Sequence, residues 1–65
     1  MIANRYLCQF QDVGKDYFVT DCAFQDGQQQ QAESYVNKVV TVLADTDCGQ
    51  VYDRQAEKVI YQTIE

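Results

Sequence analysis

Residues 44–53, ADTDCGQVYD, combine several side chains that could take part in chemistry within ten positions. Asp45, Asp47 and Asp53 supply three carboxylates, and Cys48 supplies a thiol. The carboxylates would fill positions 1, 3 and 9 of an EF-hand calcium loop. The remaining positions do not fit, because glutamine stands where the sixth residue must be glycine and alanine stands where the twelfth must be a bidentate acid. We therefore predict no calcium site in this segment.

The three cysteines, Cys8, Cys22 and Cys48, are not spaced as metal-binding or redox pairs. The chain has no histidine, whereas structural zinc sites mostly take four ligands from cysteine and histidine. An odd number of thiols fits reduced cysteines better than a disulfide framework. The negative charge of Asp45 and Asp47 beside Cys48 also disfavours a nucleophilic thiolate. The cysteines are thus expected to be small packing residues.

Other catalytic patterns are missing from the sequence. It has no histidine base, no G-x-S-x-G motif and no glycine-rich phosphate loop. Paired carboxylates can hydrolyse glycosides, but a chain of 65 residues with one predicted helix offers no evident cleft for a sugar. We predict that the protein is not an enzyme and needs no cofactor or metal.

The balance of charge narrows the choice of partner. Ten acidic residues against five basic ones give a net charge of −5. Because proteins neutralise phosphates with lysine and arginine, direct binding to nucleic acid or to an anionic membrane is disfavoured. The sequence shows no signal-peptide core and no run approaching the ~20 apolar residues of a membrane span. We expect a cytoplasmic protein that binds another protein.

The length predicts a single small domain over residues 1–65. Such a short chain buries a small core, so that burial and ordering entropy nearly cancel. Association would add stability, and the expected state is either a monomer or a homodimer.

Two stretches of alternating polarity predict a hairpin in the first third. Residues 4–12 place Tyr6, Cys8 and Phe10 on one face of a strand, and residues 17–24 alternate again after a turn. Two registers bring the apolar faces together, and one of them sets Cys8 across from Cys22. The face expected on the second strand consists of Phe18, Thr20, Cys22 and Phe24.

A helix is expected to begin at Asp26, which forms a capping box with Gln29. Apolar residues then recur at the 3.6-residue spacing of one helical stripe. These residues are Ala32, Tyr35, Val36, Val39, Val40 and Leu43.

The last third fits either a helix or a second hairpin, because short apolar runs cannot be assigned by periodicity alone. We favour strands at 49–54 and 58–64, since this part is rich in β-branched and aromatic residues. Gly49 would let the chain leave the helix and enter the third strand. The order β-β-α-β-β predicts an α+β fold, an antiparallel sheet of two hairpins with one α-helix packed on one face.

Acidic residues recur at the predicted turns and strand ends. The candidate partner-binding residues are Asp12, Asp16, Asp45, Asp47, Asp53 and Glu57. In an extended chain Asp45 and Asp47 would stand ~6.6 Å apart, close to two phosphate steps of ~3.4 Å along a DNA strand. Such a surface can imitate a phosphate track and attract a basic groove. The simpler interpretation is that these turns are merely solvated.

The chain resembles the small phage-encoded anti-CRISPR proteins in length, acidity, cysteine usage and pattern of elements. The resemblance lies in NRYLCQFQDVGKDYFVTDCAF, QAESYVNKVVTVLA and GQVYDRQAEKVIYQTI. It implies an inhibitor in the bacterial host cytoplasm that binds a CRISPR effector complex through a DNA-mimicking acidic surface and blocks recognition of target DNA. It assigns no role to individual residues. The alternative expectation is a small accessory or scaffolding module that binds its partner through an exposed strand edge.

Overall fold

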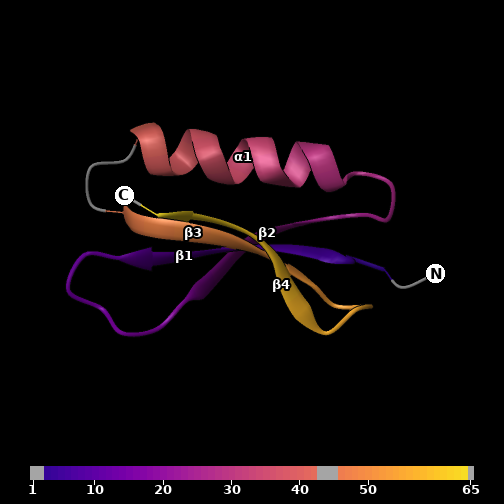
Figure 1. Ribbon diagram of the computed structural model, residues 1–65, viewed down its shortest axis with the longest axis horizontal. Helices are drawn as coiled ribbons and strands as arrows, with labels where there is room; N and C mark the ends of the chain where they lie inside the picture. The colour runs from indigo at the N-terminus through magenta and orange to yellow at the C-terminus, as the bar shows by residue number, and fades with distance from the viewer. Residues whose placement is uncertain (1–2, 43–45, 65) are drawn as a thin grey trace.

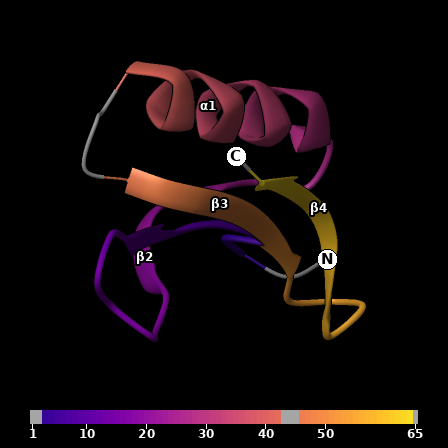
Figure 2. The same cartoon turned by 60° about the vertical axis from the view of Figure 1, so that its left-hand side comes forward.

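An antiparallel sheet with a helix on one face makes up the computed structural model, which describes residues 3–42 and 46–64 (Figures 1 and 2). Of Asp47 and Ile64 only the backbone is described. The elements are β1 (Tyr6–Asp12), β2 (Val19–Phe24), α1 (Gln29–Val42), β3 (Thr46–Asp53) and β4 (Lys58–Ile64). The strands lie in the order β2-β1-β3-β4, so β1 and β3 are central. The predicted ββαββ architecture is confirmed.

The core lies between α1 and the sheet face that it covers. Its buried apolar residues are Tyr6, Cys8, Phe10, Ala32, Val36, Val40 and Val51. The period of two on β1 and the period of 3.6 on α1 thus bury the residues that the sequence predicts. Tyr35 and Val39 flank the helical stripe and are half-buried, while Leu43 lies outside the described residues.

A β-bulge divides the pairing of β1 with β2 into two registers. Cys8 lies opposite Cys22, as one predicted register requires. Beyond this pair the register shifts, which leaves Asp21 as the extra residue of the bulge. The alternation along β2 therefore reverses, and the prediction that Phe18 and Thr20 continue the buried face is wrong, since both are exposed.

The helix begins later than an Asp26 cap would require. Gln28 closes a turn ahead of the helix: its N–H donates to the Gln25 carbonyl at 3.0 Å, and its Oε1 accepts from the Gln25 N–H at 2.8 Å. Gly27 adopts a φ of 88°, a conformation that glycine favours. The prediction that Asp26 caps the helix is wrong, because its carboxylate pairs with Arg5 instead.

Gly49 lies inside β3, so the prediction that it marks the exit from the helix is wrong. The strand begins three residues earlier, at Thr46, and Gly49 has no positive φ. A Cβ added to Gly49 would stand 2.7 Å from Cγ1 of Val36 and 3.0 Å from the Phe10 ring. Glycine is needed here because α1 packs directly against the backbone of β3.

Candidate functional site

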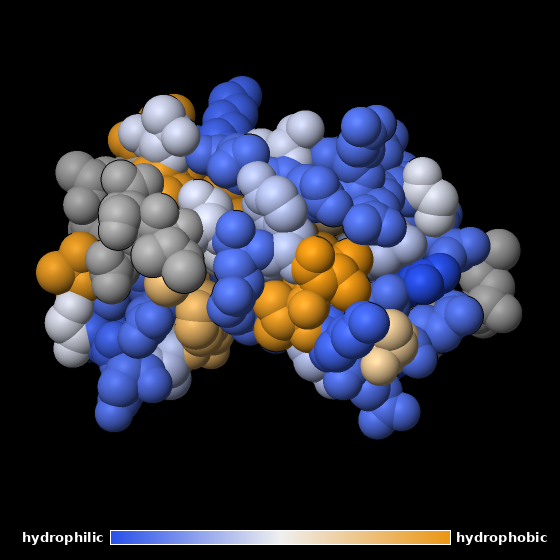
Figure 3. Space-filling model, in the orientation of Figure 1, coloured by the Kyte–Doolittle hydropathy of each residue, from blue (hydrophilic) through white to orange (hydrophobic). Residues whose placement is uncertain are grey.

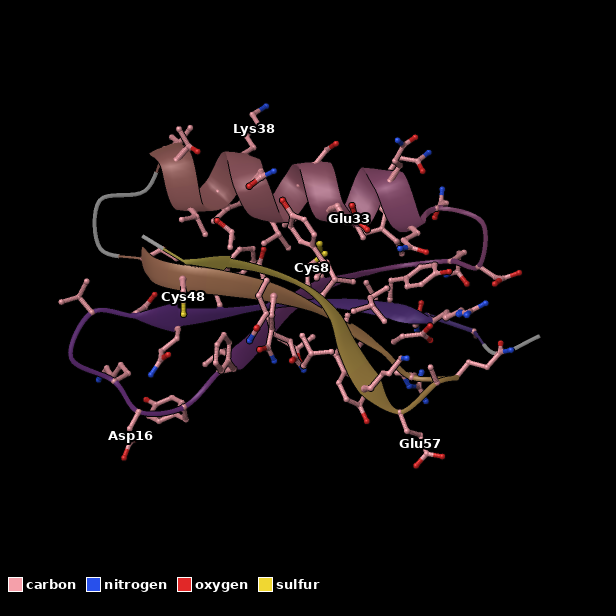
Figure 4. All side chains as sticks on the ribbon, in the orientation of Figure 1. Cys8, Asp16, Glu33, Lys38, Cys48 and Glu57 are labelled. Atoms are coloured by element: carbon pink, nitrogen blue, oxygen red, sulfur yellow. The ribbon has the colours of Figure 1, made fainter. Side chains whose placement is uncertain are left out.

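The predicted acidic residues are divided between opposite ends of the sheet. Figure 4 shows Asp16 in the β1–β2 connection and Glu57 in the β3–β4 connection, at opposite ends of the molecule. An eight-residue strand such as β3 spans about 23 Å between these ends. Asp12 ends β1 on the side of Asp16, whereas Asp45 lies outside the described residues. The described candidates therefore do not form one contiguous face.

Asp53 is a structural residue and does not belong to an exposed acidic surface. It is 3 % exposed, and Arg5 holds it with two hydrogen bonds, from Nε to Oδ1 at 3.0 Å and from Nη2 to Oδ2 at 2.9 Å. Its Oδ1 also accepts the N–H groups of Gln55 at 2.9 Å and Ala56 at 3.2 Å. The hydrogen bond from Arg5 is the main reason that the pKa of Asp53 falls to about 2. Its selection as a partner-binding residue is therefore corrected.

Further contacts tie the N-terminal segment to this end of the sheet. Arg5 also donates Nη1 to the Asp26 carboxylate, and both carboxylates raise the pKa of its guanidinium. Arg54 donates its N–H to the Arg5 carbonyl at 2.8 Å and its Nη1 to the Ala3 carbonyl at 2.8 Å. We call this region, which comprises Arg5, Asp26 and the β3–β4 connection with its flanking Asp53, the closed end.

A cavity of about 240 Å³ opens at the other end of the sheet, between α1 and the β1–β2 hairpin. It is lined by Phe10, Asp12, Val19, Asp21, Tyr35, Val39 and Thr46. A second hollow, of about 250 Å³, adjoins it across Tyr35 and Val39 and reaches Lys38 and Val42. We call this region, with the β1–β2 connection, the open end.

The polar groups of the cavity differ in how they are satisfied. Tyr35 donates its hydroxyl to the Asp21 carboxylate, which raises the pKa of Tyr35 and keeps the phenol neutral. Asp12 is exposed and forms no ion pair with any described residue. Thr46 is only 7 % exposed, yet its side chain makes no hydrogen bond within residues 3–42 and 46–64. Two carboxylates and the hydroxyl of a mostly buried threonine therefore border the cavity.

Exposed apolar side chains gather at the open end. Among the described residues, the large hydrophobic side chains that are exposed are Val13, Tyr17, Phe18, Val19, Val42 and Val59. All but Val59 belong to the β1–β2 hairpin or to the last turn of α1. Figure 3 shows hydrophobic side chains on the surface over the C-terminal half of α1, and a separate patch over β4. The open end thus combines unpaired acids with apolar contact area.

Cys8 and Cys22 are free thiols. Burial is the main reason that the pKa of Cys8 rises to about 12, and Cys8 donates Sγ to the Ala32 carbonyl at 3.7 Å. Cys48 donates Sγ to Oε1 of Gln11 at 3.4 Å. Within the described ranges no three cysteine, aspartate or glutamate side chains converge as metal ligands. The polar groups that line the cavity, the carboxylates of Asp12 and Asp21 and the hydroxyl of Thr46, can instead accept hydrogen bonds from a cationic side chain.

The sequence indicated only part of this site. The sequence predicts Asp12 as a candidate because of its charge, but it does not single out Asp21, Tyr35 or Thr46 as site residues. Asp21 reaches the cavity at a bulge, and no residue pattern in a single strand reports a bulge. Tyr35 was assigned to the helical stripe, which correctly places it against the sheet but does not reveal its partner.

Comparison with models of known protein families, with curated proteins and with solved structures gave no match. No helix in the described part of the chain has the length and apolar character needed to cross a membrane.

Proposed function

We propose that the protein is a non-enzymatic binding module that docks its open end onto a basic surface of another protein. One observation carries the proposal: Asp12 and Asp16 are exposed, form no ion pair with a described residue, and lie beside exposed apolar side chains at one end of the fold. Unpaired charge speeds and orients association, while buried apolar and aromatic contacts provide most of the affinity. The hairpin tip offers Val13 and Tyr17 for such contacts.

The partner that we propose is a basic nucleic-acid-binding complex, such as a CRISPR effector. A groove that holds phosphates is lined with lysine and arginine, so an acidic protein can compete for it. The resemblance to anti-CRISPR proteins and the net charge of −5 support this choice. In this role the open end would occupy the groove and keep target DNA out.

An interference assay tests the proposal directly. The gene is expressed in bacterial strains that each carry one active CRISPR system, and restriction of a targeted phage is measured. Inhibition should be lost when Asp12 and Asp16 are both changed to lysine. The control adds positive charge at exposed positions of the other end, through Glu57→Lys together with Gln55→Lys, and should keep inhibition. Equal loss in both variants, or no inhibition in any strain, would contradict the proposal.

A second candidate function is docking through a strand edge. β2 is an edge strand, because it pairs only with β1 in the described sheet, and its residues Val19, Thr20 and Asp21 are exposed. An added strand would bind through main-chain hydrogen bonds and would depend little on side-chain charge. Salt separates the two functions: docking of the acidic end should weaken steeply as ionic strength rises, whereas edge pairing should not.

A further inference from the structure

We infer that the cavity at the open end is a binding site for a single lysine or arginine side chain. The inference rests on the proposed function, since it names the group of the partner that the open end recognises. It makes a separate claim, however, about one cavity and the residues that line it.

The shape of the cavity suits one long side chain. Its volume of about 240 Å³ is below the ~300–1,000 Å³ of ordinary small-molecule pockets, and is therefore too small for a nucleotide. Phe10, Val19 and Val39 form the apolar part of its lining. Lysine and arginine bury an aliphatic stem against such surface while the charged head contacts polar groups.

The charge of the cavity selects a cation. Asp12 and Asp21 both line it, and no basic residue is among its described lining residues. The phenol of Tyr35 donates to Asp21, which fixes the position of that carboxylate beside the cavity. A hydrogen bond between a charged donor and a carboxylate is roughly twice as strong as one between neutral groups.

Thr46 adds a hydroxyl to the polar part of the cavity wall. Its side chain is more than nine-tenths buried, lines the cavity and has no hydrogen-bond partner among the described residues. Among the described residues no side-chain oxygen is both buried and without a hydrogen-bond partner, so the Thr46 hydroxyl is accessible at the cavity wall and can accept a hydrogen bond from a ligand. An ammonium or guanidinium group supplies donors only, so it could donate hydrogen bonds to the hydroxyl oxygen and to the two carboxylates.

Titration of the ¹⁵N-labelled full chain, followed by amide NMR shifts, tests the site. The probes are the acetylated methylamides of lysine, arginine and norleucine, which share a stem but differ in the charged head. We expect saturable shifts at Val19, Tyr35 and Val39 with the two cationic probes, and much weaker binding of norleucine. Comparable binding of norleucine would overturn the inference, because the cavity would then be a simple apolar hollow.

Three single variants locate the interaction. Asp12→Asn and Asp21→Asn should each weaken the cationic probes by about tenfold or more, as loss of a charged contact implies. Asp16→Asn removes the same charge from the same hairpin without touching the cavity lining, and should change affinity by less than about twofold. If Asp21→Asn perturbs the fold, Asp12→Asn decides, because the exposed Asp12 side chain forms no ion pair with a described residue.

The failure of this inference can be told from failure of the proposed function. Equal weakening by all three variants would show diffuse attraction to acid, which overturns the site but leaves docking of the open end intact. Absence of binding by every probe would also overturn the site. The proposed function is judged separately, by the interference assay. It fails if no strain shows inhibition, or if charge reversal at the open end has no more effect on inhibition than the control variant.

Discussion

Aspartate residues have different roles at the two ends of this sheet, one structural and one proposed to contact a partner. At the closed end Asp53 is buried, paired with Arg5 and bonded to two backbone amides of the β3–β4 connection. At the open end Asp12 is exposed and unpaired within the described chain, beside a cavity. The difference follows from where the arginine lies, since a carboxylate that is buried needs a partner and one that is exposed does not. Stability and binding are therefore expected to separate along the sheet.

The largest expected effect is loss of stability at the closed end. Asp53→Asn keeps the Oδ1 acceptor for Gln55 and Ala56 but removes the charge that pairs with Arg5. Because this leaves a half-buried guanidinium with Asp26 alone, the free energy of unfolding in urea should fall more than in any variant of an exposed acid. Glu57→Gln, in the same connection, is the control and should stay within about 0.5 kcal/mol of the parent. Equal effects would remove the distinction between the ends.

Gly49→Ala should disturb the middle of the sheet and so affect both ends. The new Cβ would meet Val36 and Phe10 at 2.7 and 3.0 Å, and overpacking of this kind costs roughly 1–3 kcal/mol. Phe10 also lines the cavity, so the cationic probes should bind less well too. The cost should shrink when Val36→Ala makes room, and a double-mutant cycle measures that coupling. Strict additivity would contradict the steric explanation.

Acid should weaken the closed end in a defined range of pH. The pKa of Asp53 is about 2 in the folded chain and near 3.9 when unfolded. Because the folded value is the lower one, the stabilisation is complete above about pH 4 and is lost as the pH falls toward 2. Urea denaturation at several pH values should show this loss in the parent and a flatter profile in Asp53→Asn. An unchanged profile in the variant would assign acid sensitivity to other groups.

The smallest expected effect comes from Tyr35→Phe at the open end. The variant removes an exposed hydrogen bond to Asp21 but keeps the ring contacts with Phe10 and Phe24, so the free energy of unfolding should fall by only about 0.5 kcal/mol. The carboxylate of Asp21 remains, so the cationic probes should still bind, although more weakly because Asp21 is less well fixed. A large drop in the free energy of unfolding would show that the open end contributes as much to stability as the closed end, and would contradict the distinction between them.

The architecture was predictable from the sequence because both periods are visible in it. Alternation in β1 and the spacing of Ala32, Val36 and Val40 predicted which faces are buried. The bulge at Asp21 was not predictable, because it depends on how two strands pair and not on either one alone. The same holds for Arg5 and Asp53, whose side chains meet across 48 positions of sequence.

The candidate site was predictable only as charge at a turn. Asp12 and Asp16 could be chosen because turns between strands are exposed. The cavity combines residues of β1, β2, α1 and β3, so its existence follows from packing of elements that are distant in the chain. The pairing of Asp53 with Arg5 likewise turned a candidate contact residue into a structural one.

The strand order β2-β1-β3-β4 also has a consequence for folding kinetics. Each hairpin forms from neighbouring residues, but the central pairing of β1 with β3 must close a loop that contains β2 and α1. Contacts that close long loops are entropically costly and limit the rate of folding. If this pairing forms at the closed end only after the transition state, loss of the Arg5–Asp53 pair accelerates unfolding and leaves the folding rate nearly unchanged. The pair would then lengthen the lifetime of the folded state by slowing unfolding.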